Sequence, residues 1–254
     1  MTGPAFVLLH GACHSPRCWS LLVSELNKAG YTAETPALPS SGSIPPTPDW
    51  TGDIDVIRKT VSKLVIDQDV VVVMHSFSGM TGGTALEGLD KESCSARGLK
   101  GGVVRLIYLL ALIVPEGFQF TPPGTRDNMF PEMKTDFEKG TVFVLPEDVK
   151  GMYYQDIDEA TAAELAKDLR PQSLASFWGT TEHAAWRIIP TTHVLAVNDN
   201  PSIVATLRHL IDMAKANSPH KIDRVIEIEG GHSPFIKKTE WTAKMLIEEA
   251  NRAI

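Results

Sequence analysis

Cysteine is scarce in this sequence: only Cys13, Cys18 and Cys94 occur among its 254 residues. Three cysteines are too few for a disulfide framework, and their spacing does not match that of zinc-binding pairs. Free thiols are typical of the reducing cytosol. We therefore expect a cytoplasmic protein that binds no metal ion or other cofactor.

Long hydrophobic runs are absent as well. The longest apolar stretch, residues 106–114, has the length of a strand, whereas a bilayer-spanning helix needs roughly 20 apolar residues. The first residues include no basic segment, and a strand is predicted from residue 5, so we expect no signal peptide. These features predict a protein without a membrane partner.

Positive charge is also in deficit. The chain has 24 Lys and Arg against 31 Asp and Glu, which gives a formal net charge of −7. Without a basic stripe to neutralise phosphates, nucleic acid is not an expected partner. The composition, 43% hydrophobic and 22% charged, is that of one globular domain with a sizeable core. We expect a small-molecule substrate as the partner, and a monomer or homodimer.

What the sequence does contain is an alternation of strands and helices. The predicted strands cover residues 5–10, 31–38, 70–73, 103–114, 193–197 and 224–228, and the predicted helices cover residues 16–28, 50–65, 203–216 and 240–251. The run of four valines at 70–73 is typical of a parallel strand that is buried on both faces. The alternation predicts an α/β fold with a mostly parallel, doubly wound sheet.

This alternation stops between residues 116 and 186. The stretch has several prolines, many large apolar side chains and one clear helix, over 159–169. So long an interruption is better explained as an inserted, mainly helical cap than as a loop. We predict one domain, with a core of residues 1–115 and 187–254 and a cap of residues 116–186. The aromatic candidates for substrate binding in this cap are Tyr153, Phe177, Trp178 and Trp186.

The third predicted strand leads into Met-His-Ser-Phe-Ser-Gly at residues 74–79. A serine at a sharp turn between a strand and a helix is typical of a nucleophile elbow. The usual pattern is Gly-x-Ser-x-Gly, and here Met74 and Ser78 occupy the two glycine positions. We interpret Ser76 as the nucleophile, because Ser78 in that role would require a shift of the strand register. His75 is expected to be a structural residue beneath the turn.

A serine nucleophile needs a histidine base and an acid that orients the base. Asp199 and His232 each follow a predicted strand, as Ser76 does. The carboxyl ends of parallel strands lie at one edge of a sheet, so we expect the three side chains to meet there. The order Ser, Asp, His is the one expected of α/β-hydrolases. Glu116, just after the strand over 103–114, is the alternative acid, and Asn198 is a weaker one.

Several segments together resemble the α/β-hydrolase superfamily, in particular the branch with plant methylesterases, hydroxynitrile lyases and small microbial hydrolases. They are His-Gly-Ala-Cys-His at 10–14 with Trp19, the elbow, Pro-Glu-Gly at 115–117, and Gly-His-Ser-Pro-Phe at 231–235. The resemblance implies an α/β-hydrolase fold. It also implies an oxyanion hole formed by the backbone N–H groups of Ala12 and Phe77. Cys13, in the same loop as Ala12, is a further candidate for substrate binding.

These residues lead to three hypotheses about function. The first is a serine hydrolase that cleaves an ester or lactone of a small, largely apolar molecule. The second is a lyase or cofactor-free enzyme on the same fold, which would catalyse carbon–carbon cleavage or cyclisation. Related hydroxynitrile lyases carry Thr and Lys where this chain has Gly11 and Ser233, which disfavours cyanohydrin cleavage. The third, suggested by Met74 and Ser78, is a non-catalytic binder of small ligands.

Overall fold

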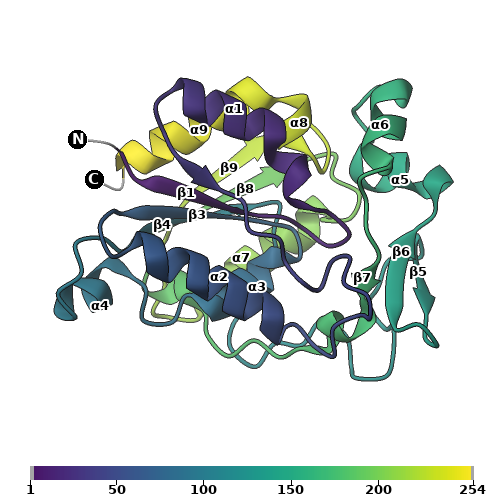
Figure 1. Cartoon of the computed structure of the whole chain (residues 1–254), viewed down its shortest axis with the longest axis horizontal. Coiled ribbons are helices and arrows are strands. Elements are labelled where there is room, and N and C mark those ends of the chain that lie inside the picture. The colour runs from purple at the N-terminus through teal and green to yellow at the C-terminus, as the bar shows by residue number, and fades with distance from the viewer. Residues whose placement is uncertain (1–2, 253–254) are drawn as a thin grey trace.

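A six-stranded parallel sheet forms the centre of the molecule (Figure 1) in the computed structural model, which describes residues 3–252. The strand order is β2-β1-β3-β4-β8-β9, and every neighbouring pair is parallel. The strands are β1 (Ala5–Leu9), β2 (Ala33–Glu34), β3 (Val70–His75), β4 (Val103–Leu109), β8 (Thr191–Ala196) and β9 (Ile222–Ile228). The strand order reverses between β1 and β3, which is where open α/β sheets place their ligand sites.

Helices cover both faces of this sheet, as Figure 1 shows. One face carries α1 (Ser20–Lys28), which follows the short 3-10 turn Pro16–Trp19, together with α8 (Pro234–Lys237) and α9 (Thr239–Arg252). The other face carries α2 (Thr51–Leu64), α3 (Ser78–Ala85), α4 (Lys91–Ala96) and α7 (Val204–Ala216). The predicted doubly wound α/β fold is therefore confirmed.

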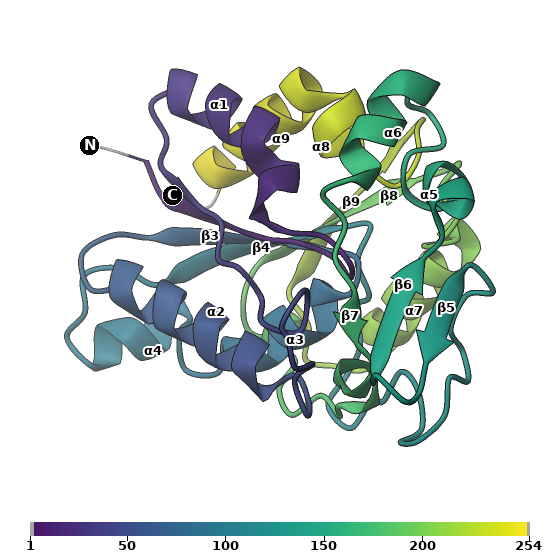
Figure 2. The ribbon, with the colours of Figure 1, turned by 45° about the vertical axis from the view of Figure 1, so that its right-hand side comes forward.

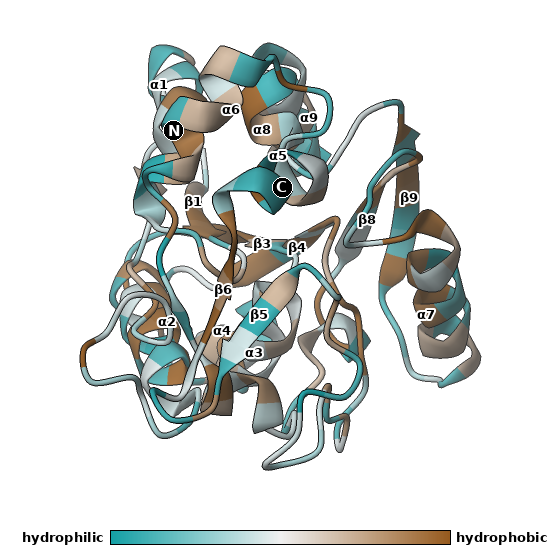
Figure 3. Ribbon diagram, turned by 90° about the vertical axis from the view of Figure 1, so that its right-hand side faces the viewer, coloured by the Kyte–Doolittle hydropathy of each residue, from teal (hydrophilic) through white to brown (hydrophobic). Residues whose placement is uncertain are grey.

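Side-chain alternation along the strands explains the two layers. In β1, Phe6 and Leu8 pack toward α1 and α9, whereas Val7 and Leu9 pack toward α2. All four side chains are completely buried, because a parallel strand with helices on both faces has no solvent-facing side. Figure 3 shows the same pattern, with apolar central strands and mixed hydropathy along the surrounding helices.

A second, smaller sheet follows β4 in the chain. It is antiparallel and consists of β5 (Met133–Asp136), β6 (Thr141–Val144) and β7 (Gln172–Ser173). With it lie α5 (Pro146–Tyr153), α6 (Glu159–Ala166) and the 3-10 turn Leu174–Trp178, whereas the 3-10 turn Ala185–Arg187 packs against α3. Figures 1 and 2 show this layer at the right of the main sheet. Its three short strands were not predicted from the sequence, and the division into core and cap stays a prediction.

Two predicted strands are several residues shorter in the structure. Residues 31–38 pair with β1 only at Ala33 and Glu34. The predicted strand over 103–114 ends at Leu109, because Leu110 has a left-handed backbone, with φ 52°. Residues 110–114 are apolar and mostly buried without being a strand. Within residues 3–252, no helix is both long enough and apolar enough to cross a membrane.

Asp53, in the first turn of α2, is a fully buried carboxylate. It accepts hydrogen bonds from the Ser40 backbone N–H, at 2.8 Å, and from the Ser40 hydroxyl, at 2.5 Å. Burial raises the pKa of Asp53 from 3.8 to about 6, although the two bonds from Ser40 act in the opposite direction. The carboxylate thus fastens the loop after β2 to α2 at a cost in desolvation.

The raised pKa of Asp53 predicts a pH-dependent stability. Between the unfolded pKa of 3.8 and the folded pKa of about 6, the folded chain binds more protons, so the free energy of unfolding falls as pH rises through this range. Because a tenfold difference in proton affinity corresponds to ~1.4 kcal/mol, wild type should lose on the order of 3 kcal/mol relative to Asp53→Asn between pH 4 and pH 7. Urea unfolding at both pH values measures this. Asp55→Asn, at an exposed site on the same helix, is the control, and a wild-type profile parallel to that of Asp53→Asn would contradict the prediction.

Candidate active site

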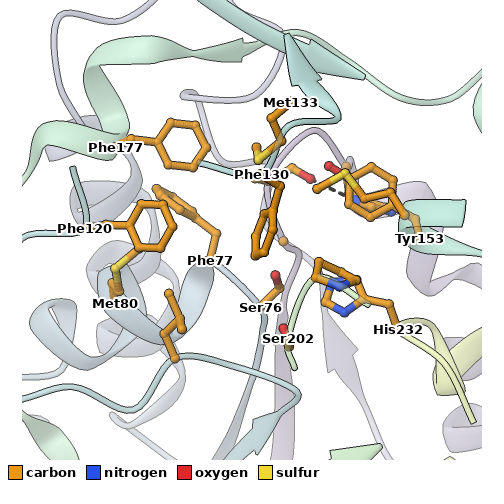
Figure 4. Close-up of a pocket in the computed structure, with 16 residues that line it drawn as sticks. Ser76, Phe77, Met80, Phe120, Phe130, Met133, Tyr153, Phe177, Ser202 and His232 are labelled. Carbon is orange, nitrogen blue, oxygen red and sulfur yellow. Dashed lines mark hydrogen bonds between the residues drawn. The ribbon is translucent and has the colours of Figure 1, made fainter. Parts of the chain in front are cut away.

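Ser76 lies at the turn between β3 and α3, with its backbone in the left-handed region at φ 55°. Its carbonyl accepts hydrogen bonds from the Gly79 N–H at 3.1 Å and from the Leu112 N–H at 3.3 Å. Among the described residues, none forms a hydrogen bond with the Ser76 hydroxyl, which points into a pocket in Figure 4. The turn therefore presents a free hydroxyl between two buried neighbours, His75 and Phe77.

Ser78, at the second glycine position of the elbow pattern, uses its hydroxyl to hold the turn. The oxygen accepts the His75 N–H at 2.9 Å, and it lies 2.9 Å from the Leu9 and His75 carbonyl oxygens. The close approach that needs glycine falls one residue later. A Cβ on Gly79 would lie 2.4 Å from the Leu112 carbonyl oxygen. Ser78 is buried and bonded, so it does not compete with Ser76 for the pocket.

Met74, at the first glycine position, is accommodated by a glycine on the facing helix. The Met74 side chain is completely buried. A Cβ on Gly82 of α3 would lie 2.6 Å from Met74 Sδ and 2.8 Å from its Cγ. The Met74 side chain therefore fits at a position where the elbow pattern has glycine, because Gly82 on the helix leaves the space that it fills.

Asp199 and His232 lie side by side in the loops after β8 and β9. Both Asp199 carboxylate oxygens are 3.0 Å from His232 Nδ1, and both side chains are buried. The Ser202 N–H also donates to Asp199, at 3.1 Å. Since a carboxylate only accepts hydrogen bonds, Nδ1 carries the proton and Nε2 is the free basic nitrogen. His232 lines the same pocket as Ser76.

The two alternative acids lie elsewhere. Glu116 pairs with Arg187, whose Nε is 3.1 and 3.0 Å from its two carboxylate oxygens. The Asn198 side chain donates to Glu229 at 3.2 Å. Asp199 is thus the one of the three predicted acids whose side chain contacts His232.

Two other histidines surround His232 without being charged. His75 Nε2 donates to the His232 carbonyl oxygen at 3.0 Å, and the two rings are 4.5 Å apart. His14 is held by the Ala12 carbonyl at 2.9 Å and the Tyr154 hydroxyl at 3.1 Å. Burial lowers the pKa of His14 to about 3 and that of His75 well below its usual value. Both rings are therefore neutral, and neither repels a protonated His232.

The two residues expected to supply oxyanion donors belong to the lining of the same pocket. Ala12 and Phe77 both line it, with Ser76 and His232. In the described part of the chain, no residue accepts a hydrogen bond from either backbone N–H. Gly11 lets the loop lie against the nucleophile, because a Cβ there would be 3.1 Å from Ser76 Cβ. Two free N–H groups beside a serine can bind a developing oxyanion.

The rest of the pocket is apolar (Figure 4). Its apolar and aromatic lining residues, besides Ala12 and Phe77, are Met80, Leu112, Phe120, Phe130, Met133, Met152, Tyr153, Phe177 and Pro201. None of the described residues that line it is Asp, Glu, Lys or Arg. Of the five predicted substrate-binding residues, Tyr153 and Phe177 line the pocket. The remaining apolar lining residues, apart from Ala12 and Phe77, were not predicted from the sequence. Most are methionine or phenylalanine, which look like ordinary core residues in a sequence.

The structure does not bring Cys13, Trp178 or Trp186 to the lining of this pocket. The Cys13 sulfur lies 3.9 Å from the Val142 carbonyl oxygen. The Trp178 indole donates to the Thr125 carbonyl at 2.9 Å. Trp186 is completely buried and packs among the core residues next to α2 and α7, where its N–H donates to the Val114 carbonyl. Across residues 3–252, no group of three or more His, Cys, Asp or Glu residues is arranged to hold a metal ion.

The sequence and the fold are also similar to those of known proteins. Residues 6–245 match the profile of the Alpha/beta hydrolase family. The Alpha/beta hydrolase nvfD of Aspergillus novofumigatus is 30% identical over 100% of this chain and 99% of its own length. Methyl jasmonate esterase 1 of Vitis vinifera is 24% identical over 59% of each chain. The crystal structure of the methylesterase MES16 from Arabidopsis has the same fold, with a TM-score of 0.73, 22% identity and coverage of 98% and 99% of the two chains.

The packing of Met74 on Gly82 predicts a coupled effect on stability. Gly82→Ala should lower the free energy of unfolding by about 1–3 kcal/mol, because overpacking against Met74 outweighs the gain in helix propensity. Gly83→Ala, in the same helix, is the control, because its Cβ would meet atoms only at 3.4 Å and beyond. In a double-mutant cycle by urea unfolding, adding Met74→Ala should make Gly82→Ala less harmful. Independent, additive effects would contradict the coupling.

The acid assignment predicts a contrast between two isosteric changes. Asp199→Asn should lower kcat by on the order of 10³–10⁴, because the amide cannot stabilise a protonated His232. Glu116→Gln should stay within about twofold of wild type, since Glu116 contacts Arg187 and not His232. Steady-state kinetics on a neutral methyl ester measure both. A large loss in Glu116→Gln with little loss in Asp199→Asn would reverse the assignment.

Proposed function

We propose that this chain, which belongs to the alpha/beta hydrolase family, is a serine esterase that hydrolyses an ester or lactone of a small, uncharged, largely apolar molecule. One observation carries the proposal. Ser76 and His232, which is paired with Asp199 at 3.0 Å, line a pocket together with Ala12 and Phe77, and among the described residues the Ser76 hydroxyl and the backbone N–H groups of Ala12 and Phe77 have no hydrogen-bond partner. This is the arrangement needed to attack a carbonyl and bind the resulting oxyanion.

The reaction would proceed in two steps. His232 Nε2 takes the Ser76 proton while Ser76 Oγ attacks the ester carbonyl carbon, and Asp199 stabilises the protonated imidazole. The Ala12 and Phe77 N–H groups hold the oxyanion, typically with about 3 kcal/mol per donor. The alcohol then leaves with the proton from His232, and the acyl group remains bound to Ser76 as an ester. Water, deprotonated by His232, then releases the carboxylic acid and regenerates Ser76.

The lining of the pocket supports a neutral substrate. Phe120, Phe130 and Phe177 offer apolar faces, and among the described residues no charged side chain meets the pocket. A charged group that is buried without a partner costs several kcal/mol, so an ester that also carries a free carboxylate would bind poorly. The name of the Vitis vinifera relative, Methyl jasmonate esterase 1, is consistent with an uncharged methyl ester as substrate.

A matched pair of substrates tests this proposal. Methyl hexanoate and monomethyl glutarate are similar in size, and only the second carries a carboxylate. We expect kcat/KM to be about 100-fold higher for methyl hexanoate, corresponding to ~3 kcal/mol of unpaired charge. In ¹⁸O-labelled water, the product acid should gain one labelled oxygen, because hydrolysis delivers it from water. The Ser76→Ala variant should show almost no turnover.

Two outcomes would contradict the proposal. Turnover of a larger panel of neutral esters without incorporation of ¹⁸O would favour the lyase or cofactor-free alternative. Binding of such molecules to wild type without any turnover would favour the non-catalytic binder.

A further inference from the structure

The loop that carries the Ala12 N–H is held by a segment about 160 residues later in the chain. Cys13, the next residue, has a left-handed backbone with φ 63°. Its N–H donates to Gln172 Oε1 at 3.1 Å, and its carbonyl accepts the Arg170 N–H at 2.8 Å. The Ala12 carbonyl is 2.9 Å from His14 Nδ1. Both carbonyls and the Cys13 N–H therefore have partners, whereas the Ala12 N–H has none among the described residues.

Gln172 itself can adopt only one amide orientation. Its Nε2 donates to Ser40 Oγ at 2.7 Å and to Ser176 Oγ at 3.0 Å. Both serines must accept, because Ser40 gives its own proton to Asp53 and Ser176 gives its proton to the Ser173 carbonyl. A flipped amide would set Nε2 against the Cys13 N–H, donor against donor. With a side chain that is 1% exposed, no water can compensate for that mismatch.

We propose that Gln172 is a positioning residue for the oxyanion hole. By accepting the Cys13 N–H it keeps Cys13 in the left-handed conformation and the Ala12 N–H directed into the pocket beside Ser76. The assignment rests on the proposed function, because an oxyanion donor matters only if a carbonyl is attacked. The small antiparallel sheet thus supports part of the site from outside the main sheet, through β7. The hydrogen-bonded series runs from Asp53 through Ser40 and Gln172 to Cys13.

Replacement of Gln172 by two residues of similar size separates positioning from stability. Gln172→Met keeps the volume and removes the acceptor, whereas Gln172→Glu keeps an acceptor for Cys13 but adds a carboxyl group close to Ser40 and Asp53. We expect Gln172→Met to lower kcat about 10- to 100-fold with KM within about threefold of wild type, because an oxyanion donor acts mainly in the transition state. Gln172→Glu should unfold at a lower temperature than Gln172→Met and yet retain the higher kcat.

A tetrahedral inhibitor gives an independent readout. An alkylboronic acid that adds to Ser76 places an anionic oxygen in the oxyanion hole, so its affinity should fall in Gln172→Met by the same factor as kcat. Gln68→Met is the matched control, since it makes the same substitution before the start of β3, at the opposite end of that strand from Ser76, and it should stay within about threefold of wild type. If Gln172→Met does not fold, Ser40→Ala removes the Gln172 partner with less change in packing, and it should lower kcat roughly three- to tenfold at constant KM.

The outcomes distinguish this inference from the proposed function. If wild type hydrolyses esters and Gln172→Met or Ser40→Ala keeps full kcat and boronate affinity, the inference is overturned and the esterase proposal stands. Activities that follow thermal stability, with Gln172→Glu slower than Gln172→Met, would also overturn it. If wild type neither hydrolyses esters nor binds the boronate, the proposed function itself fails, and the inference fails with it.

Discussion

The site depends on the left-handed backbone of Ser76. A non-glycine residue with φ 55° is strained by about 1–3 kcal/mol, and such strain persists only where the surroundings hold it. Here the Gly79 and Leu112 N–H groups hold the Ser76 carbonyl, and the Ser78 hydroxyl holds the preceding peptide. If this turn relaxed, the hydroxyl would leave the pocket and the neighbouring N–H groups would have nothing to stabilise.

The same kind of strain recurs around the pocket. Of the four non-glycine residues with positive φ between residues 3 and 252, three follow the adjacent strands β1, β3 and β4: Cys13, Ser76 and Leu110. Each is fixed by partners from another part of the chain. Gln172 holds Cys13, and the Leu110 carbonyl accepts the Ser202 hydroxyl at 3.0 Å, while the Ser202 N–H donates to Asp199. These hydrogen bonds connect the loop that carries Asp199 to the end of β4, and they connect the loop that carries Ala12 to β7.

Sequence reasoning reached the parts of this arrangement that leave a local signal. The valine run predicted β3, and the positions of Ser76, Asp199 and His232 after separate strands predicted that they would lie at one edge of a parallel sheet. The small sheet was missed because its strands are two to four residues long, too short to show an alternation of polar and apolar residues. The pairing of Met74 with Gly82 had a weak signal, in two consecutive glycines shortly after the elbow. Gln172 had none, because its partners Cys13 and Ser40 are 159 and 132 positions away.

Nucleophilic attack by Ser76 is the step on which the whole mechanism rests, and the site of a covalent adduct tests it directly. The intact protein would be treated with an alkyl fluorophosphonate, and its mass would be measured by mass spectrometry. Digestion would then locate the modified residue. We expect one adduct per chain on Ser76, and no adduct in Ser76→Ala. An adduct on Ser78 or on Ser202, or an unmodified wild-type protein, would show that Ser76 is not the nucleophile.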